Sequence, residues 1–139
     1  MVVAFFLSSA MFEDKSLTAG STAPVIETTE GLIVGDDENS HDKTIIINFW
    51  NPKNPSSRIV NRELSSLYGN GKDENYRFIS ICTDPDETLM NEVMRIDGIN
   101  PDNNFSYSKI SPRVFKDYGV ENASATYKIS SDSKILEKF

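Results

Sequence analysis

The fold is decided by Thr44-Ile45-Ile46-Ile47-Asn48-Phe49-Trp50, which is followed after three residues by Asn54-Pro55-Ser56-Ser57-Arg58. The first segment is rich in β-branched and aromatic residues, which is typical of a strand buried on both faces. The second predicts a helix start, because Asn54 is a good N-cap and Pro55 suits the first helical position, where no N–H is needed. A buried strand is therefore expected to lead directly into a helix.

That helix is expected to end at Gly69 and Gly71. Four apolar side chains recur within it at the spacing of one helix face, and this spacing predicts a stripe that packs on the core. The stripe consists of Val60, Leu64, Leu67 and Tyr68.

The flanking sequence predicts the remaining elements of an α/β fold. Val25-Ile26 and Leu32-Ile33-Val34 indicate a β-hairpin. Downstream we expect a strand at 77–82, a helix opening at 84–87, a short helix over 111–119, and two final strands at 124–129 and 134–139. The second helix should turn Leu89, Val93 and Ile96 to the core. Strand–helix–strand crossovers imply a parallel central pair of strands.

Composition and charge exclude several classes of function. The chain has 139 residues, the size of one domain, and a formal net charge of −7. An acidic chain is not attracted to phosphate backbones or anionic membrane surfaces, so we expect no nucleic acid and no membrane insertion. Cys82 is the single cysteine and His41 the single histidine, so we expect no internal disulfide, no metal and no cofactor.

The first residues allow two interpretations. Val2–Leu7 is an apolar run, and Ser8-Ser9-Ala10 after it has the small residues of a signal-peptidase cut site, although no positive charge precedes it. Residues 1–18 are therefore interpreted as a leader or the remnant of an export signal, or alternatively as a short strand or disordered leader. Residues 19–139 are expected to form a single domain.

Two separated blocks resemble the extracytoplasmic thiol–disulfide oxidoreductases of the thioredoxin superfamily. Members read hydrophobic-Asn-Phe-Trp, three residues, and then Cys-Pro-Pro-Cys-Arg or a close variant. Phe49-Trp50, Pro55 and Arg58 match this pattern, while Asn54 and Ser57 stand at the two cysteine positions. The resemblance implies a thioredoxin-like fold, with a central mixed sheet flanked by helices and an N-terminal β-hairpin.

The second block is Tyr118-Gly119-Val120, which the family follows after three residues with a cis-proline. Ser124 stands at that position. A cis bond without proline costs about 2.5–4 kcal/mol, so we expect a trans peptide bond before Ser124 and a rearranged groove. The family's C-terminal helix is absent from the given sequence, which stops at Phe139. Either the natural product continues beyond this residue, or one face of the sheet is left partly bare; a bare apolar face would favour a homodimer or another protein partner.

These replacements remove the chemistry that the resemblance would imply. Disulfide exchange needs a thiolate nucleophile and a second, resolving thiol. Asn54 has no nucleophile, and no histidine lies near Ser56 or Ser57 to activate a hydroxyl. We therefore expect no catalytic residue and no redox site at this position.

Several residues around this position have both a binding and a structural interpretation. Trp50, Lys53, Pro55, Ser56 and Arg58 could line a groove or bind an anion at the helix N-terminus. Alternatively, the tryptophan simply packs at the strand end, and the rest is an ordinary helix cap. Cys82 could be a sensor thiol, but is better explained as a small core residue.

Three functional hypotheses follow. The leading one is a redox-inactive thioredoxin-like module, exported to the periplasm or cell envelope, that binds a protein or peptide in the degenerate groove. The second is a degenerate oxidoreductase that uses Cys82 or a partner's thiols. If the protein is not exported, we expect it in the cytoplasm. The third is a small-anion binder at the helix N-terminus.

Overall fold

The strand expected at 44–50 lies at the centre of a five-stranded sheet in the computed structural model, which describes residues 17–35, 43–71, 73–121 and 123–139. The leader proposed for 1–18 falls almost wholly outside these residues. The elements, in chain order, are β1 (Ile26–Thr28), β2 (Gly31–Val34), β3 (Thr44–Trp50), α2 (Pro55–Tyr68), β4 (Tyr76–Cys82), α3 (Glu87–Asp97), β5 (Asn104–Phe105), the 3-10 helix η2 (Tyr107–Lys109), α4 (Pro112–Asp117), β6 (Ala125–Ile129) and β7 (Ile135–Lys138).

The sheet is mixed, with strand order β5-β4-β3-β6-β7. Strand β3 pairs in parallel with β4 and antiparallel with β6, so that Asn48 stands opposite Ser80 on one side and Thr126 on the other. The expected parallel central pair and the β1–β2 hairpin are both confirmed. Strand β5, of two residues, was not predicted because so short a strand carries no alternating pattern.

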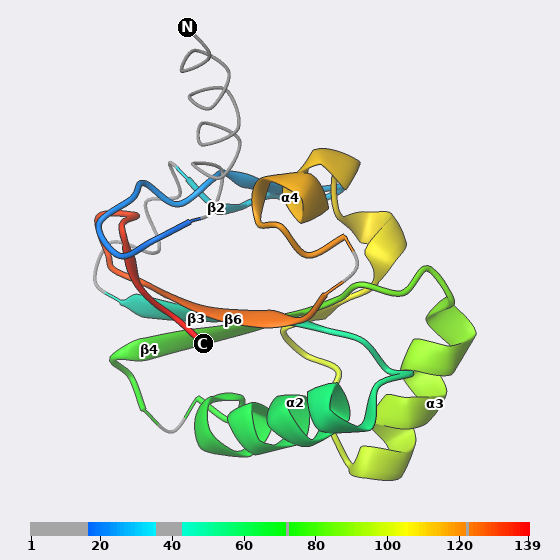
Figure 1. The fold of residues 1–139 in the computed structure, drawn as a ribbon. Helices are drawn as coiled ribbons and strands as arrows, with labels where there is room; N and C mark the ends of the chain where they lie inside the picture. Colours follow the sequence, from blue (N-terminus) through cyan, green and yellow to red (C-terminus); the bar gives the residue numbers. More distant parts are fainter. Residues whose placement is uncertain (1–16, 36–42, 72, 122) are drawn as a thin grey trace, which may run out of the picture.

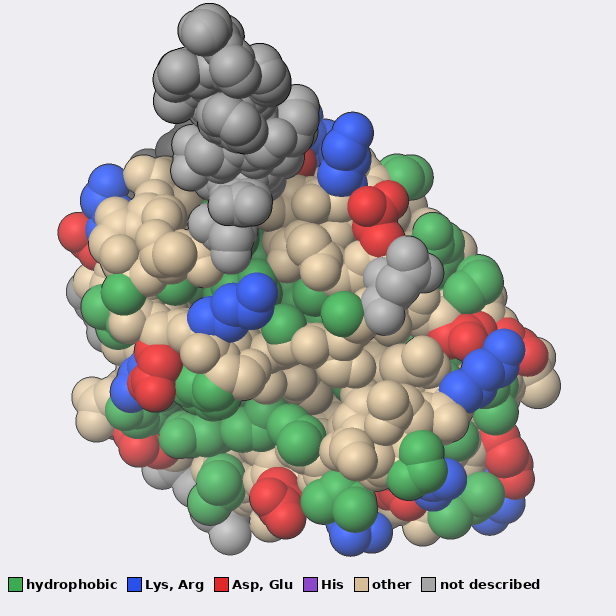
Figure 2. Space-filling view, viewed as in Figure 1, with side chains coloured by type: hydrophobic (Ala, Val, Ile, Leu, Met, Phe, Trp, Pro, Cys, Tyr) green, Lys and Arg blue, Asp and Glu red, His purple; other side chains and the backbone are tan. Residues whose placement is uncertain are grey.

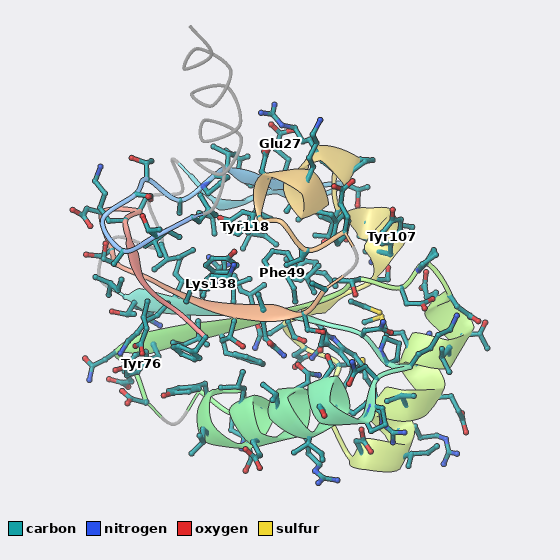
Figure 3. All side chains as sticks on the ribbon, in the orientation of Figure 1. Glu27, Phe49, Tyr76, Tyr107, Tyr118 and Lys138 are labelled. Atoms are coloured by element: carbon teal, nitrogen blue, oxygen red, sulfur yellow. The ribbon has the colours of Figure 1, made fainter. Side chains whose placement is uncertain are left out.

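Helices cover the two faces of the sheet unequally (Figure 1). Helix α4 and the β1–β2 hairpin lie over one face, and α2 and α3 lie over the other. The first face carries the larger hydrophobic core, in which the rings of Phe49 and Tyr118 are 5.1 Å apart. Figure 3 shows both residues in the space between the sheet and α4. This apolar packing fixes β3, and therefore the start of α2, in place.

The second face carries a smaller core beneath α3. It consists of Trp50, Cys82, Met90, Val93, Met94 and Ile99. The prediction for Val93 is confirmed, but that for Ile96 is wrong, because Ile96 is 61% exposed. Met90 and Met94 take the core-facing positions instead, which rotates the buried side of α3 away from Ile96.

The apolar stripe predicted for α2 faces the core only in part. Leu64 and Tyr68 are half-buried, whereas Val60 and Leu67 are 42% and 64% exposed, and the buried helix residues are Ser57 and Asn61. The cause lies in the sheet, where the polar Asn48 and Ser80 stand on the face toward α2 beside the buried Ile46 and Phe78. Asn48 Nδ2 and Ser80 Oγ both donate to Asn61 Oδ1, over 2.9 Å and 2.8 Å.

Thr126 extends this polar layer across the sheet, because its hydroxyl donates to Asn48 Oδ1 over 2.8 Å. All four residues of the network are buried, so their mutual hydrogen bonds replace those that water would make. The helix is therefore oriented by hydrogen bonds rather than by its most hydrophobic side, and this leaves Val60 at the surface.

Candidate functional site

The start of α2 is closed by its own cap. Asn54 Oδ1 accepts from the backbone N–H of Ser56 over 2.9 Å and of Ser57 over 3.2 Å. The N–H of Arg58 donates to the Asn54 carbonyl over 3.0 Å, and Pro55 has no N–H. The first-turn amides that an anion would need are thus already bonded, so the geometry gives no support to the anion-binding hypothesis.

The two blocks that are distant in sequence meet at Ser57. Its Oγ accepts from the backbone N–H of Asn51 over 2.8 Å and from the hydroxyl of Ser124 over 2.9 Å. Ser124 lies immediately before β6, and the described residues contain no cis peptide bond, as expected at this position. A pair of hydrogen-bonded hydroxyls therefore stands where the sequence resemblance places a cysteine and a proline.

A groove opens beside this hydroxyl pair, between α2 and the end of β6. It encloses a cavity of about 470 Å³ and is lined by Asn48, Asn54, Ser56, Ser57, Val60, Ser124, Ala125, Thr126 and Phe139. No lining side chain is ionisable. Figure 2 shows hydrophobic side chains gathered along this face between the sheet and α2. The groove combines an apolar wall with neutral hydrogen-bonding groups, which is the usual composition of a binding site.

Five of these lining residues were not singled out as site residues from the sequence. Asn48, Thr126 and Ala125 come from strands, and Val60 was assigned to the core. The strand pattern does hold a signal for two of them, since a polar residue within a buried strand needs a partner. Phe139 carried no such signal, because it is the residue after β7 and only the fold brings it to α2.

The basic residues of this region are held in ion pairs outside the groove. Lys53 Nζ lies 3.3 Å from Asp84. Arg58 makes two hydrogen bonds to Asp97, of 2.8 Å and 3.2 Å, and this pairing raises the pKa of the guanidinium. Pro55 lies beside Arg58 in a separate shallow hollow. None of the three lines the groove, contrary to the sequence-based expectation.

Trp50 does not reach the groove either. Its side chain is fully buried in the core beneath α3, so the structural interpretation holds and the binding interpretation is wrong. The indole Nε1 has no hydrogen-bond partner among the described residues. The residue fills space at the end of β3 and contributes no contact surface.

Cys82 lies in the same core, in an environment that disfavours reaction of its thiol at neutral pH. Its thiol is fully buried and donates to the carbonyl of Asp84 over 3.5 Å. Burial raises the pKa of the thiol to about 11, so the reactive thiolate is scarce. The interpretation of Cys82 as a small core residue agrees with this environment.

The described ranges offer no group of side chains for metal chemistry: they contain no cluster of three or more His, Cys, Asp or Glu side chains placed to hold a metal ion. They also contain no helix that is long and apolar enough to cross a membrane. Within the groove, the remaining chemistry is hydrogen bonding and apolar contact.

The chain is similar in fold to several solved structures. No protein-family profile matches the sequence, and no curated protein matches it. A thioredoxin-like protein from Parabacteroides distasonis superposes with a TM-score of 0.73 at 22% identity, over 88% of this chain and 88% of that one. The C-terminal domain of a thiol-disulfide oxidoreductase from Bacteroides thetaiotaomicron gives 0.65 at 26% identity, over 89% and 87%.

A third solved structure, from Chlorobium tepidum and described as a thiol:disulfide interchange protein DsbE, gives a TM-score of 0.67 at 13% identity, over 88% of this chain and 85% of that one. The chain is therefore a protein of the thioredoxin-like fold. More particularly, it resembles the thiol–disulfide oxidoreductases of that fold while holding one cysteine, Cys82, and no pair that could form a disulfide.

Proposed function

We propose that this protein is a redox-inactive thioredoxin-like module that binds a protein or peptide partner in the groove beside Ser57 and Ser124. The absence of sulfur at the start of α2 carries the proposal. Asn54 and Ser57 occupy the two positions from which cysteines would exchange disulfides, and a serine hydroxyl stays protonated at neutral pH.

The groove is suited to an extended peptide. Its neutral, partly apolar lining would accept an uncharged segment: the hydroxyls of Ser57 and Ser124 can hydrogen bond to a peptide backbone, and Val60 and Ala125 can contact apolar side chains.

Binding of short peptides tests the proposal. We would select binders from a displayed library of random peptides and measure the Kd of one synthetic peptide for the full chain. Val60→Asp and Ser124→Trp should each weaken binding about tenfold or more, because they place a charge or a large ring in the groove. Ile96→Asp, an exposed apolar residue on α3, is the control and should leave the Kd unchanged. Equal binding by all four proteins would refute the proposal.

The alternative is a degenerate oxidoreductase that works with Cys82 or with a partner's thiols. The likeness to thiol–disulfide oxidoreductases favours it, whereas the burial and raised pKa of Cys82 oppose it. Insulin reduction in the presence of dithiothreitol separates the two. We expect the background rate; a faster rate that Cys82→Ala abolishes would establish the enzyme.

We further propose that the protein is exported to the periplasm or cell envelope. The apolar run Val2–Leu7 and the small residues Ser8–Ala10 support this, as remnants of an export signal. Fractionation of cells that express the native reading frame tests it: recovery of the protein in the cytoplasmic fraction alone would contradict export.

A further inference from the structure

A second cavity, of about 330 Å³, lies at the other end of α2. It is lined by Arg62, Ser65, Ser66, Gly69, Asn70, Phe78, Asp97, Gly98, Ile99, Asn100, Asp102 and Asn104. Its walls are the C-terminal half of α2 and the loop that joins α3 to β5, and it shares no residue with the groove beside Ser124. The volume is at the lower end of the range for small-molecule sites, about 300–1,000 Å³.

Two side chains of opposite charge, both on exposed residues, line this cavity. Arg62 and Asp102 both line it, and neither makes an ion pair or a side-chain charge contact with any described residue, including the other. Asp97, by contrast, is only 6% exposed and has both carboxylate oxygens bonded to Arg58. The cavity therefore offers one cation and one anion for an occupant.

Further features favour a positive group near Asp102. The Oδ1 atom of Asn104 is buried without a hydrogen-bond partner, while its Nδ2 donates to the carbonyls of Asn100 and Asp102. In addition, α2 and α3 both end at this cavity, with their C-cap residues Gly69 and Gly98 in its wall. The negative ends of two helix dipoles favour a cation at this place.

The floor is apolar, since Phe78 and Ile99 are both nearly fully buried. We propose that the cavity binds a small zwitterion with an apolar side chain, of which a free α-amino acid is the simplest. Arg62 pairs with its carboxylate, Asp102 accepts from its ammonium group, and Phe78 and Ile99 contact its side chain. This site is separate from the peptide groove and does not depend on the proposed function.

Titration of the isotope-labelled full chain with L-leucine, followed by amide chemical shifts, tests the proposal. We expect saturable shifts at the Ser65 and Asn104 amides. Arg62→Gln and Asp102→Asn should each raise the Kd about tenfold or more, because each removes a charge-assisted hydrogen bond. Arg113→Gln, an exposed cation on α4, should leave it unchanged.

Leucine analogues test separately the carboxylate contact with Arg62 and the ammonium contact with Asp102. N-acetyl-leucine lacks the ammonium charge and leucine methyl ester lacks the carboxylate, so both should bind at least about tenfold more weakly. Absence of shifts at these amides up to the solubility limit, or equal binding of leucine and either analogue, would overturn the proposal. The groove variant Val60→Asp should bind leucine normally, so this result does not depend on the peptide experiment.

Discussion

The hydroxyl of Ser124 donates to the Oγ of Ser57 over 2.9 Å, and this bond joins two segments 67 residues apart in the chain. Ser57 sits at the first turn of α2 and Ser124 just before β6. The structure thus brings together the two positions at which the family resemblance places a cysteine and the cis-proline, and here both hold hydroxyl groups that hydrogen bond to each other. The two positions are adjacent, as the resemblance implies, but neither side chain carries a thiol.

If Asn54 and Ser57 correspond to the two cysteine positions of the family, cysteines introduced there should form a disulfide. Asn54 Oδ1 already reaches the Ser57 backbone, so the side chains at these two positions meet at the helix start. The double variant Asn54→Cys, Ser57→Cys should form an intramolecular disulfide in air, seen as a mass loss of two hydrogens and no free thiol besides buried Cys82. The single variant Asn54→Cys is the control and should remain a thiol. Failure of the double variant to oxidise would mean that these positions are not equivalent to the two cysteines.

Removing one member of the polar network beneath α2 should lower the free energy of unfolding. Asn61→Ala leaves Asn48 Nδ2 and Ser80 Oγ buried without an acceptor, at about 1–3 kcal/mol for each unpaired group. Urea unfolding should therefore show a loss of at least about 2 kcal/mol. Asn70→Ala, an exposed amide after the same helix, should change stability by less than about 0.5 kcal/mol. Equal effects of the two substitutions would show that water satisfies the layer.

The ion pair between Arg58 and Asp97 ties the start of α2 to the end of α3. Its two parallel hydrogen bonds use the planar guanidinium, which lysine cannot reproduce. Arg58→Lys should lower the free energy of unfolding, and Arg58→Met should lower it further, because Asp97 would be left largely buried without a counter-ion. Arg113→Met breaks an exposed pair on α4 and should cost less than either. The double variant Arg58→Met, Asp97→Leu should recover part of the loss.

The free energy of unfolding should fall at high pH because the Cys82 thiol is buried. A thiol whose pKa is raised from 9.0 to about 11 stays protonated in the folded chain while it ionises in the unfolded one, so stability is lost as pH rises between these values. The slope for one such group is about 1.4 kcal/mol per pH unit. Tyr118 and Tyr127, whose pKa values are also raised by burial, add to the loss at higher pH.

The measurement compares urea unfolding of the wild type and Cys82→Ala at pH 7 and at pH 10. The variant is less stable throughout because it leaves a cavity, but its decline with pH should be shallower. Parallel declines would contradict the burial of the thiol.

Much of this fold was predictable because its signals are local. The buried run Thr44–Trp50, the Asn54 cap and Pro55 form one continuous pattern, and the structure places all three as predicted. The position of Ser124 beside Ser57 followed from the family resemblance rather than from any local signal. Its contact depends on sheet pairing between β3 and β6, which the sequence does not encode locally.

The orientation of α2 could not be predicted from helix periodicity alone. That pattern finds the most hydrophobic face of a helix and assumes that the facing sheet is apolar. Here Asn48 and Ser80 interrupt two strands that are otherwise buried and apolar, and parallel pairing puts them side by side. Two isolated polar residues in buried strands were the available signal, and they call for a polar partner such as Asn61.

The orientation of α2 also predicts that a lysine substitution on its apolar stripe costs less stability than one on the buried side of α3. Leu67 belongs to the apolar stripe of α2 but is 64% exposed, whereas Val93 on α3 is buried against Trp50 and Met90. Leucine and lysine have similar helix propensities, so Leu67→Lys should change the free energy of unfolding by no more than about 0.5 kcal/mol. Val93→Lys should cost about 3 kcal/mol or more, because it buries an unpaired charge. Thermal unfolding measures both. A large loss for Leu67→Lys would mean that the stripe faces the core after all, and the polar layer, the exposed Val60 and the groove beside it would then all be misplaced.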